Sequence, residues 1–152
     1  MKAWIVGIIL LALPAAAQAL PGEDHWTVEL DPRETAKLEE SRQLIEEGRY
    51  CETLPALLEL AEALPANADV FNMLGYVHRK MGLLEESGAH YARALYLKPD
   101  HRGALEYQGE LFLLQGNMAA AQANLERLDT ICAAGCEERD ELAAAIRGSA
   151  DN

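Results

Sequence analysis

Residues 68–101 read ADVFNMLGYVHRKMGLLEESGAHYARALYLKPDH, and this stretch decides the fold. Its small residues Gly75 and Ser87 stand where two antiparallel helices must approach closely, and Tyr91 stands where the space between them must be filled. Pro99 ends the second helix, because proline lacks the N–H that a helix interior requires. One such helix pair leaves apolar faces uncovered, so it requires neighbours of the same kind.

The same landmarks recur with a period of 34 residues on both sides of this stretch. Residues 34–67 carry Ser41 and Pro65 at the positions of Gly75 and Pro99, and residues 102–135 carry Gly109 at the position of Gly75. A fixed period of 34 is the signature of the tetratricopeptide repeat, which the chain resembles over 102 consecutive residues. The resemblance implies an all-α fold of three helix-turn-helix repeats in a right-handed superhelix.

The sequence ahead of the repeats has two parts. Residues 1–19 combine a basic start, a short apolar core and an Ala-x-Ala site, so we expect a secretory signal peptide cleaved after Ala19. Its apolar run is shorter than the roughly 20 residues of a membrane-spanning helix, so we expect no stable membrane insertion after cleavage. Residues 20–30 show no helical period and are expected to form an extended arm. The protein is therefore expected to be periplasmic or secreted.

The helical domain is expected to cover residues 31–148, starting with the N-cap and proline of Asp31-Pro32. After the third repeat, residues 137–147 carry apolar side chains on one face and acids in the first turn. A repeat array needs such a helix to cover its last apolar face. We therefore expect a C-terminal capping helix at 137–147 and a frayed tail at 149–152.

In this family the first helix of each pair lines a concave groove that binds an extended peptide or a helix of a partner protein. The groove residues carried over from the family pattern are Leu38, Arg42, Asn72, Tyr76, Arg79, Lys80, Glu106 and Glu110. A merely solvated helix face is the alternative for these positions. The family's clamp for a C-terminal carboxylate is matched only at Asn72, so that specificity is not supported.

Charge narrows the class of partner. The formal net charge is −12, and it becomes −13 without residues 1–19, which hold one lysine and no acid. Nucleic-acid binding is disfavoured, because it depends on basic residues that neutralise phosphates. Within this acidic chain Arg42, Arg79 and Lys80 are expected to form a basic patch, which would attract an acidic or C-terminal segment of a protein or peptide partner.

The cysteines allow two interpretations. Cys132 and Cys136 flank the turn into the capping helix, so we expect a disulfide between them, while Cys51 lies two repeats away and should be unpaired. The alternative is a thiol-redox or copper site at the Cys132/Cys136 pair, since paired thiolates suit Cu(I). The spacing is Cys-x-x-x-Cys and differs from the redox Cys-x-x-Cys, which favours the structural bridge.

The sequence offers no sign of catalysis. It has no nucleophile motif, glycine-rich phosphate loop or metalloprotease signature, and no two histidines stand three or four residues apart. We therefore expect no enzyme activity, cofactor or metal site. Two hypotheses remain: a periplasmic protein–protein interaction adaptor, and a thiol-redox or copper carrier built on a repeat scaffold.

Overall fold

The computed structural model describes residues 31–150, and the expected signal peptide and arm at 1–30 lie outside this range. The described residues form helices and turns without a strand, which confirms the all-α prediction. The helices are α1 (Pro32–Glu46), α2 (Tyr50–Ala63), α3 (Ala68–Lys80), α4 (Leu84–Leu97), α5 (Arg102–Leu114), α6 (Met118–Ile131) and α7 (Glu137–Ala150). Within residues 31–150, every helix is too short or too polar to cross a membrane.

Local chemistry sets the helix starts. Asp31 and Glu34 form a capping box at α1, where the Asp31 side chain accepts from the Arg33 backbone N–H at 2.7 Å. Asn67 caps α3 by accepting from the backbone N–H groups of Asp69 and Val70. These caps satisfy N–H groups that the first helical turn leaves without a partner.

A glycine in the left-handed conformation reverses the chain between the two helices of each pair. The φ angles are 72° at Gly48, 79° at Gly82 and 73° at Gly116, three residues that stand 34 apart in the sequence. A residue with a Cβ atom is strained in this conformation. The 34-residue period of the sequence therefore corresponds to a repeated turn in the structure.

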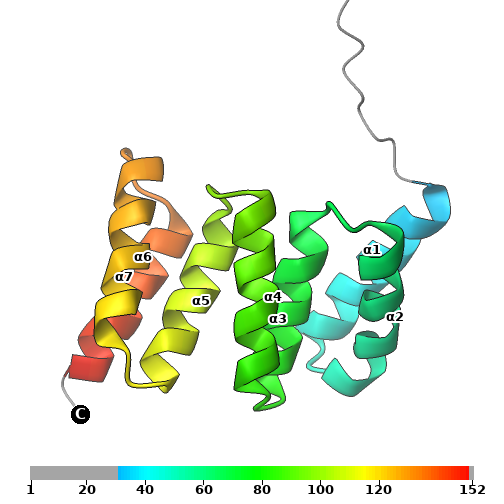
Figure 1. The fold of residues 1–152 in the computed structure, drawn as a ribbon, viewed down its shortest axis with the longest axis horizontal. Coiled ribbons are helices and arrows are strands. Elements are labelled where there is room, and N and C mark those ends of the chain that lie inside the picture. Colours follow the sequence, from blue (N-terminus) through cyan, green and yellow to red (C-terminus); the bar gives the residue numbers. More distant parts are fainter. Residues whose placement is uncertain (1–30, 151–152) are drawn as a thin grey trace, which may run out of the picture.

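The helices form two layers in a row that runs from α1 and α2 at one end to α6 and α7 at the other (Figure 1). In the inner layer α1 contacts α3, α3 contacts α5 and α5 contacts α7, whereas α2, α4 and α6 in the outer layer do not contact one another within residues 31–150. Neighbouring helices are thus closer on the inner side. The row therefore curves, and the inner layer lines its concave face.

Two glycines allow the closest approaches between helices. A Cβ atom on Gly75 of α3 would lie 2.5 Å from the ring of Tyr91 in α4, which is completely buried. A Cβ atom on Gly109 of α5 would lie 2.6 Å from the side chain of Leu142 in α7. Leu142 is itself completely buried, so α7 covers the last repeat as the capping helix was expected to do.

Two arginines link successive repeats at equivalent positions. Arg93 of α4 donates to the carbonyl oxygen of Pro65 at 3.0 Å, and Arg127 of α6 donates to that of Pro99 at 2.6 Å. Each bond spans 28 residues, and the two bonds are one repeat apart. The prolines that end the second helices thus also present a carbonyl group to the next repeat.

The C-terminal boundary differs from the expectation. α7 extends to Ala150, whereas the sequence analysis ended it at 147 and placed a tail at 149–152. A glycine inside a helix costs about 1 kcal/mol relative to alanine, but Gly148 does not adopt the left-handed conformation that ends many helices.

Candidate functional site

The concave face carries two neighbouring pockets. The first, here the α1–α3 pocket, has a volume of about 480 Å³ and is lined by Arg42, Ile45, Glu46, Tyr50, Asp69, Asn72, Met73, Tyr76 and Tyr107. The second, here the α5–α7 pocket, has a volume of about 430 Å³ and is lined by Tyr76, Arg79, Lys80, Glu106, Tyr107, Glu110, Glu141 and Ala144. Tyr76 and Tyr107 belong to both pockets and form the wall between them.

Three tyrosines run along this face from one helix pair to the next, and we call them the tyrosine row. The ring centroids of Tyr76 and Tyr107 lie 5.0 Å apart, and those of Tyr50 and Tyr76 lie 6.2 Å apart. Tyrosine offers a large apolar surface and a polar end, a combination that is enriched at protein interfaces. Burial first, and then the nearby Glu106, raises the pKa of Tyr107 to about 12, so its phenol remains neutral.

The expected basic patch is not a set of three unpaired cations. The Arg79 guanidinium Nη1 lies 2.6 Å from Glu110 Oε2, and only 9% of the Arg79 side chain is exposed. The same guanidinium lies 5.4 Å from the ring centroid of Tyr76 and 5.6 Å from that of Tyr107. Arg42 pairs with Glu39 at 3.2 Å. The prediction of three unpaired cations is therefore wrong, because α5 supplies a carboxylate to Arg79, which still lines the α5–α7 pocket.

Leu38 also lies elsewhere than expected. It is 4% exposed and belongs to the apolar core that includes Leu57, Val70 and Leu74. An apolar side chain at that position gains more from burial among α1, α2 and α3 than from lying in an open groove. Leu38 therefore packs in the core and does not line the groove.

Glu106, which was expected as a groove contact, is almost completely buried. It is 3% exposed on α5. Burial, a hydrogen bond with Glu141 and the charges of Glu141, Glu110 and Glu138 raise the pKa of Glu106 to about 9. Its carboxyl group is therefore protonated at neutral pH.

Asn72 and Tyr76 lie in the α1–α3 pocket as expected for groove residues. The Oδ1 atom of Asn72 is buried and has no hydrogen-bond partner among the described residues. A buried oxygen of this kind costs free energy until a donor reaches it. The N–H group of a bound polypeptide is one such donor.

Sequence reasoning missed two groups near this face, Tyr107 and His101. The Nδ1 atom of His101 accepts from the Ala104 backbone N–H at 3.2 Å and so caps α5. Its Nε2–H then donates to Asp69 Oδ1 at 2.9 Å, which joins α5 to α3. This hydrogen bond lowers the pKa of the Asp69 carboxyl. Both residues are detectable only once α3 and α5 are known to be neighbours.

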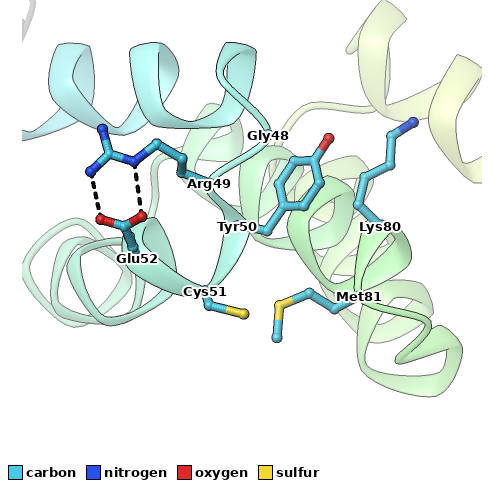
Figure 2. Close-up of a pocket in the computed structure, with 7 residues that line it drawn as sticks. All are labelled: Gly48, Arg49, Tyr50, Cys51, Glu52, Lys80 and Met81. Carbon is cyan, nitrogen blue, oxygen red and sulfur yellow. Dashed lines mark hydrogen bonds and ion pairs between the residues drawn. The ribbon is translucent and has the colours of Figure 1, made fainter.

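A third pocket, of about 560 Å³, lies at the turn between α1 and α2 (Figure 2). In Figure 2 the sulfur atoms of Cys51 and Met81 turn toward one another, and Arg49 is held by two bonds to Glu52. Cys51 is exposed and unpaired, as expected. Among the described residues no three His, Cys, Asp or Glu side chains are arranged to hold a metal ion, here or elsewhere.

The other two cysteines lie at the turn between α6 and α7. Cys132 and Cys136 have Cα atoms 5.7 Å apart and are joined as a disulfide in the structure. The bond connects the end of α6 to the residue before α7. It therefore constrains the position of the helix that covers the last repeat.

Comparison with known proteins shows what the repeats resemble. The sequence model described as the tetratricopeptide repeat matches residues 68–101, the unit that contains α3 and α4. This unit is similar to a tetratricopeptide repeat. A probable biofilm formation methyltransferase, WspC, of Pseudomonas putida is 36% identical over 63 residues, which are 41% of this chain and 15% of that protein. The chain therefore spans a small part of that relative's length.

Solved structures share the fold at low sequence identity. The TPR2B domain of yeast Sti1, in complex with pHsp70, has a TM-score of 0.72 and 14% identity, over 80% of this chain and 98% of that one. The Sgt2 domain of Aspergillus fumigatus has a TM-score of 0.72 and 13% identity, over 82% of each chain. The Yersinia enterocolitica secretion chaperone SycD, in complex with a peptide of YopD, has a TM-score of 0.67 and 17% identity, over 82% of this chain and 94% of that one. These similarities establish a tetratricopeptide solenoid.

Proposed function

We propose that this protein is an interaction adaptor that holds a segment of a partner polypeptide against its concave face. The observation that carries the proposal is the tyrosine row, which runs along that face with a pocket on each side of Tyr76 and Tyr107. Aromatic side chains in desolvated pockets supply most of the binding free energy at many interfaces. Solved proteins of the same fold carry peptides, including the YopD peptide on SycD.

The unpaired oxygen of Asn72 supports a polypeptide ligand. The Asn72 side chain lines the α1–α3 pocket beside Tyr76, and rotation of its amide would present this buried oxygen to a backbone N–H of an extended segment. The sequence-based preference for an acidic or C-terminal segment depended on three unpaired cations. Since Arg79 pairs with Glu110 and Arg42 pairs with Glu39, the charge argument for an acidic partner loses most of its support.

We further propose that the protein works in the periplasm after removal of residues 1–19. The signal-peptide pattern supports export, and the bonded pair Cys132–Cys136 fits an oxidising compartment. A structural role for this pair is favoured over redox or copper chemistry. No third His, Cys, Asp or Glu is arranged with the pair to hold a metal ion among the described residues.

A non-enzymatic role follows from the same features. The concave face offers tyrosine rings, an ion pair and a protonated carboxyl, which suit recognition. The aligned 63 residues of the Pseudomonas putida methyltransferase are 15% of that protein, so its activity is not carried over to this chain.

A pull-down from an envelope extract of the source organism tests the adaptor role. Wild-type protein is compared with Tyr76→Ala, and with Tyr96→Ala as a matched control. Tyr96 is 77% exposed on α4 and lies in neither concave pocket. Wild type and Tyr96→Ala should recover the same partner, and Tyr76→Ala should lose it. Equal recovery by all three proteins would show that the tyrosine row is not the binding surface.

A further inference from the structure

Two acids of the α5–α7 pocket form no ion pair among the described residues. Glu110 is paired with Arg79, and Glu138 has Arg102 at 3.5 Å. Glu106 and Glu141 have no such partner, although Lys80 also lines the pocket. Glu106 is more than nine-tenths buried, and both side chains line the pocket. Burial, and then a hydrogen bond with Glu141, raises the pKa of Glu106 to about 9, so Glu106 holds a proton near neutral pH.

The walls of the pocket already suit a cation. The Arg79 guanidinium lies within 5.6 Å of the ring centroids of both Tyr76 and Tyr107 and ends on a carboxylate. Aromatic faces attract cations, and a carboxylate gives a guanidinium its strongest hydrogen bonds. In the same pocket, an entering basic side chain would meet Glu106 and Glu141. The pocket thus offers an external cation aromatic rings and carboxylates, the same kinds of group that Arg79 contacts.

We propose that the α5–α7 pocket receives a lysine or arginine side chain of the bound polypeptide, which pairs with the carboxylates of Glu106 and Glu141. This inference depends on the proposed function, because it assigns the chemistry of the segment that the concave face holds. The ammonium or guanidinium group brings a positive charge and N–H donors to two carboxylates. The proton of Glu106 leaves to solvent, so one positive charge replaces another.

Proton release makes this binding dependent on pH. The titratable groups around Glu106 are Tyr107 and Glu110 from α5, Glu138 and Glu141 from α7, and Arg79 and Lys80 from α3. The outer helix α6 contributes Asn124, which is uncharged and donates to the Leu105 carbonyl oxygen. Among these groups Glu106 has its pKa raised to about 9, so it carries the proton near neutral pH. Affinity for a basic segment should therefore rise between pH 6 and pH 9, the range over which the proton becomes easier to remove.

The test is selection from a phage library of random dodecapeptides at physiological salt, with protein purified from expression of the full chain. Wild type should enrich peptides that contain lysine or arginine. Glu141→Gln should lose the enrichment, whereas Glu137→Gln should keep it. Both changes remove one acid from α7, but only Glu141 lines the pocket. The pair of variants therefore separates recognition in the pocket from general attraction to an acidic chain.

The outcomes distinguish the inference from the proposed function. If binding of the selected peptides depends on Tyr76 but the peptides are not enriched in lysine or arginine, the inference is overturned and the adaptor role stands. The same conclusion holds if Glu141→Gln selects basic peptides as strongly as wild type does. If no selected peptide depends on Tyr76, the adaptor role fails and the inference fails with it. The affinity for a selected basic peptide should be about tenfold lower in Glu141→Gln than in wild type, because one charge-assisted contact is lost.

Calorimetry of that selected peptide gives an independent readout. Titration at pH 7 in phosphate and in Tris buffer, which differ in ionisation enthalpy, reports the number of protons released. Wild type should release close to one proton per bound peptide. The Glu106→Gln variant has a neutral side chain of the same shape at this position, so it should release no proton. Binding to wild type without proton release contradicts the replacement of the proton.

Discussion

Arg79 of α3 and Glu110 of α5 are joined by an ion pair with a nitrogen–oxygen distance of 2.6 Å. Both side chains line the α5–α7 pocket together with Tyr76 and Tyr107, and the pair joins two helices of the inner layer. Each was expected to contact a partner, and in the structure they are paired with each other. The pair therefore helps to set the spacing of the helices that carry Tyr76 and Tyr107.

Replacement of Arg79 by methionine should lower stability. It leaves the Glu110 carboxylate without its partner, and breaking a fully buried pair in this way costs roughly 3 to 5 kcal/mol. Glu110 is 31% exposed, so water offsets part of the loss. We expect a decrease of about 2 kcal/mol in the free energy of unfolding, measured with urea.

The matched control is Arg33→Met. Arg33 is exposed in the first turn of α1, and no ion pair involves it among the described residues. Its replacement should change the free energy of unfolding by less than about 0.5 kcal/mol. If the two variants lose the same stability, the Arg79–Glu110 pair does not hold the inner layer together.

Two glycine-to-alanine changes on neighbouring helices should act in opposite directions. Gly75→Ala places a methyl group 2.5 Å from the buried Tyr91 ring, so overpacking should cost about 1 to 3 kcal/mol. Gly88→Ala on α4 meets Leu111 at 3.6 Å, an ordinary contact, and should gain up to about 1 kcal/mol from helix propensity. Thermal unfolding of both variants measures the contrast. A stabilised Gly75→Ala protein would contradict the described contact between α3 and α4.

The Cys132–Cys136 bond should be present in the exported protein, with Cys51 free. Intact mass after alkylation without reduction should show one modified thiol, and three would refute the bond. For so short a loop the chain-entropy contribution is about 2 kcal/mol. Cys136→Ser should therefore increase hydrogen exchange in α7 while α3 and α4 stay protected.

The buried carboxyl of Glu106 should make stability depend on pH. Its pKa is about 9 in the folded protein and 4.5 for an unperturbed glutamate, so folding favours the protonated form. The resulting stabilisation is complete below about pH 4.5 and is lost as the pH rises toward 9. Glu106→Gln stays neutral, so it should become increasingly more stable than wild type across this range.

Urea unfolding of wild type and Glu106→Gln at intervals from pH 5 to pH 9 measures this difference. Glu137→Gln, an exposed change in the first turn of α7, serves as the control and should follow wild type. A constant difference between wild type and Glu106→Gln would mean that Glu106 is ionised throughout.

The sequence predicts the fold well because the repeat is a local property. Gly48, Gly82 and Gly116 mark three turns at one period, and each turn is decided by the backbone of a single residue. The start of α1 at Asp31-Pro32 is also local, since the capping bonds reach only three residues along the chain. Such features need no knowledge of the neighbouring repeat.

The candidate site is predicted less well because it depends on pairs between repeats. Asn72 and Tyr76 are placed correctly by position on their helix. The pairing of Arg79 is missed because its partner Glu110 lies one repeat later, and the burial of Glu106 because its partner Glu141 lies on the capping helix. Side chains that one helix seems to expose are thus buried by the next helix.

The most direct test of the account is photocrosslinking from the concave face. p-Benzoylphenylalanine is placed at position 76 or at position 96 of the full chain and irradiated in cells of the source organism. Tyr76 lies between the two concave pockets, whereas Tyr96 is exposed on α4 outside them. Position 76 should give a discrete crosslinked polypeptide, and position 96 should not. The same crosslink from both positions, or only from position 96, would contradict binding in the concave groove.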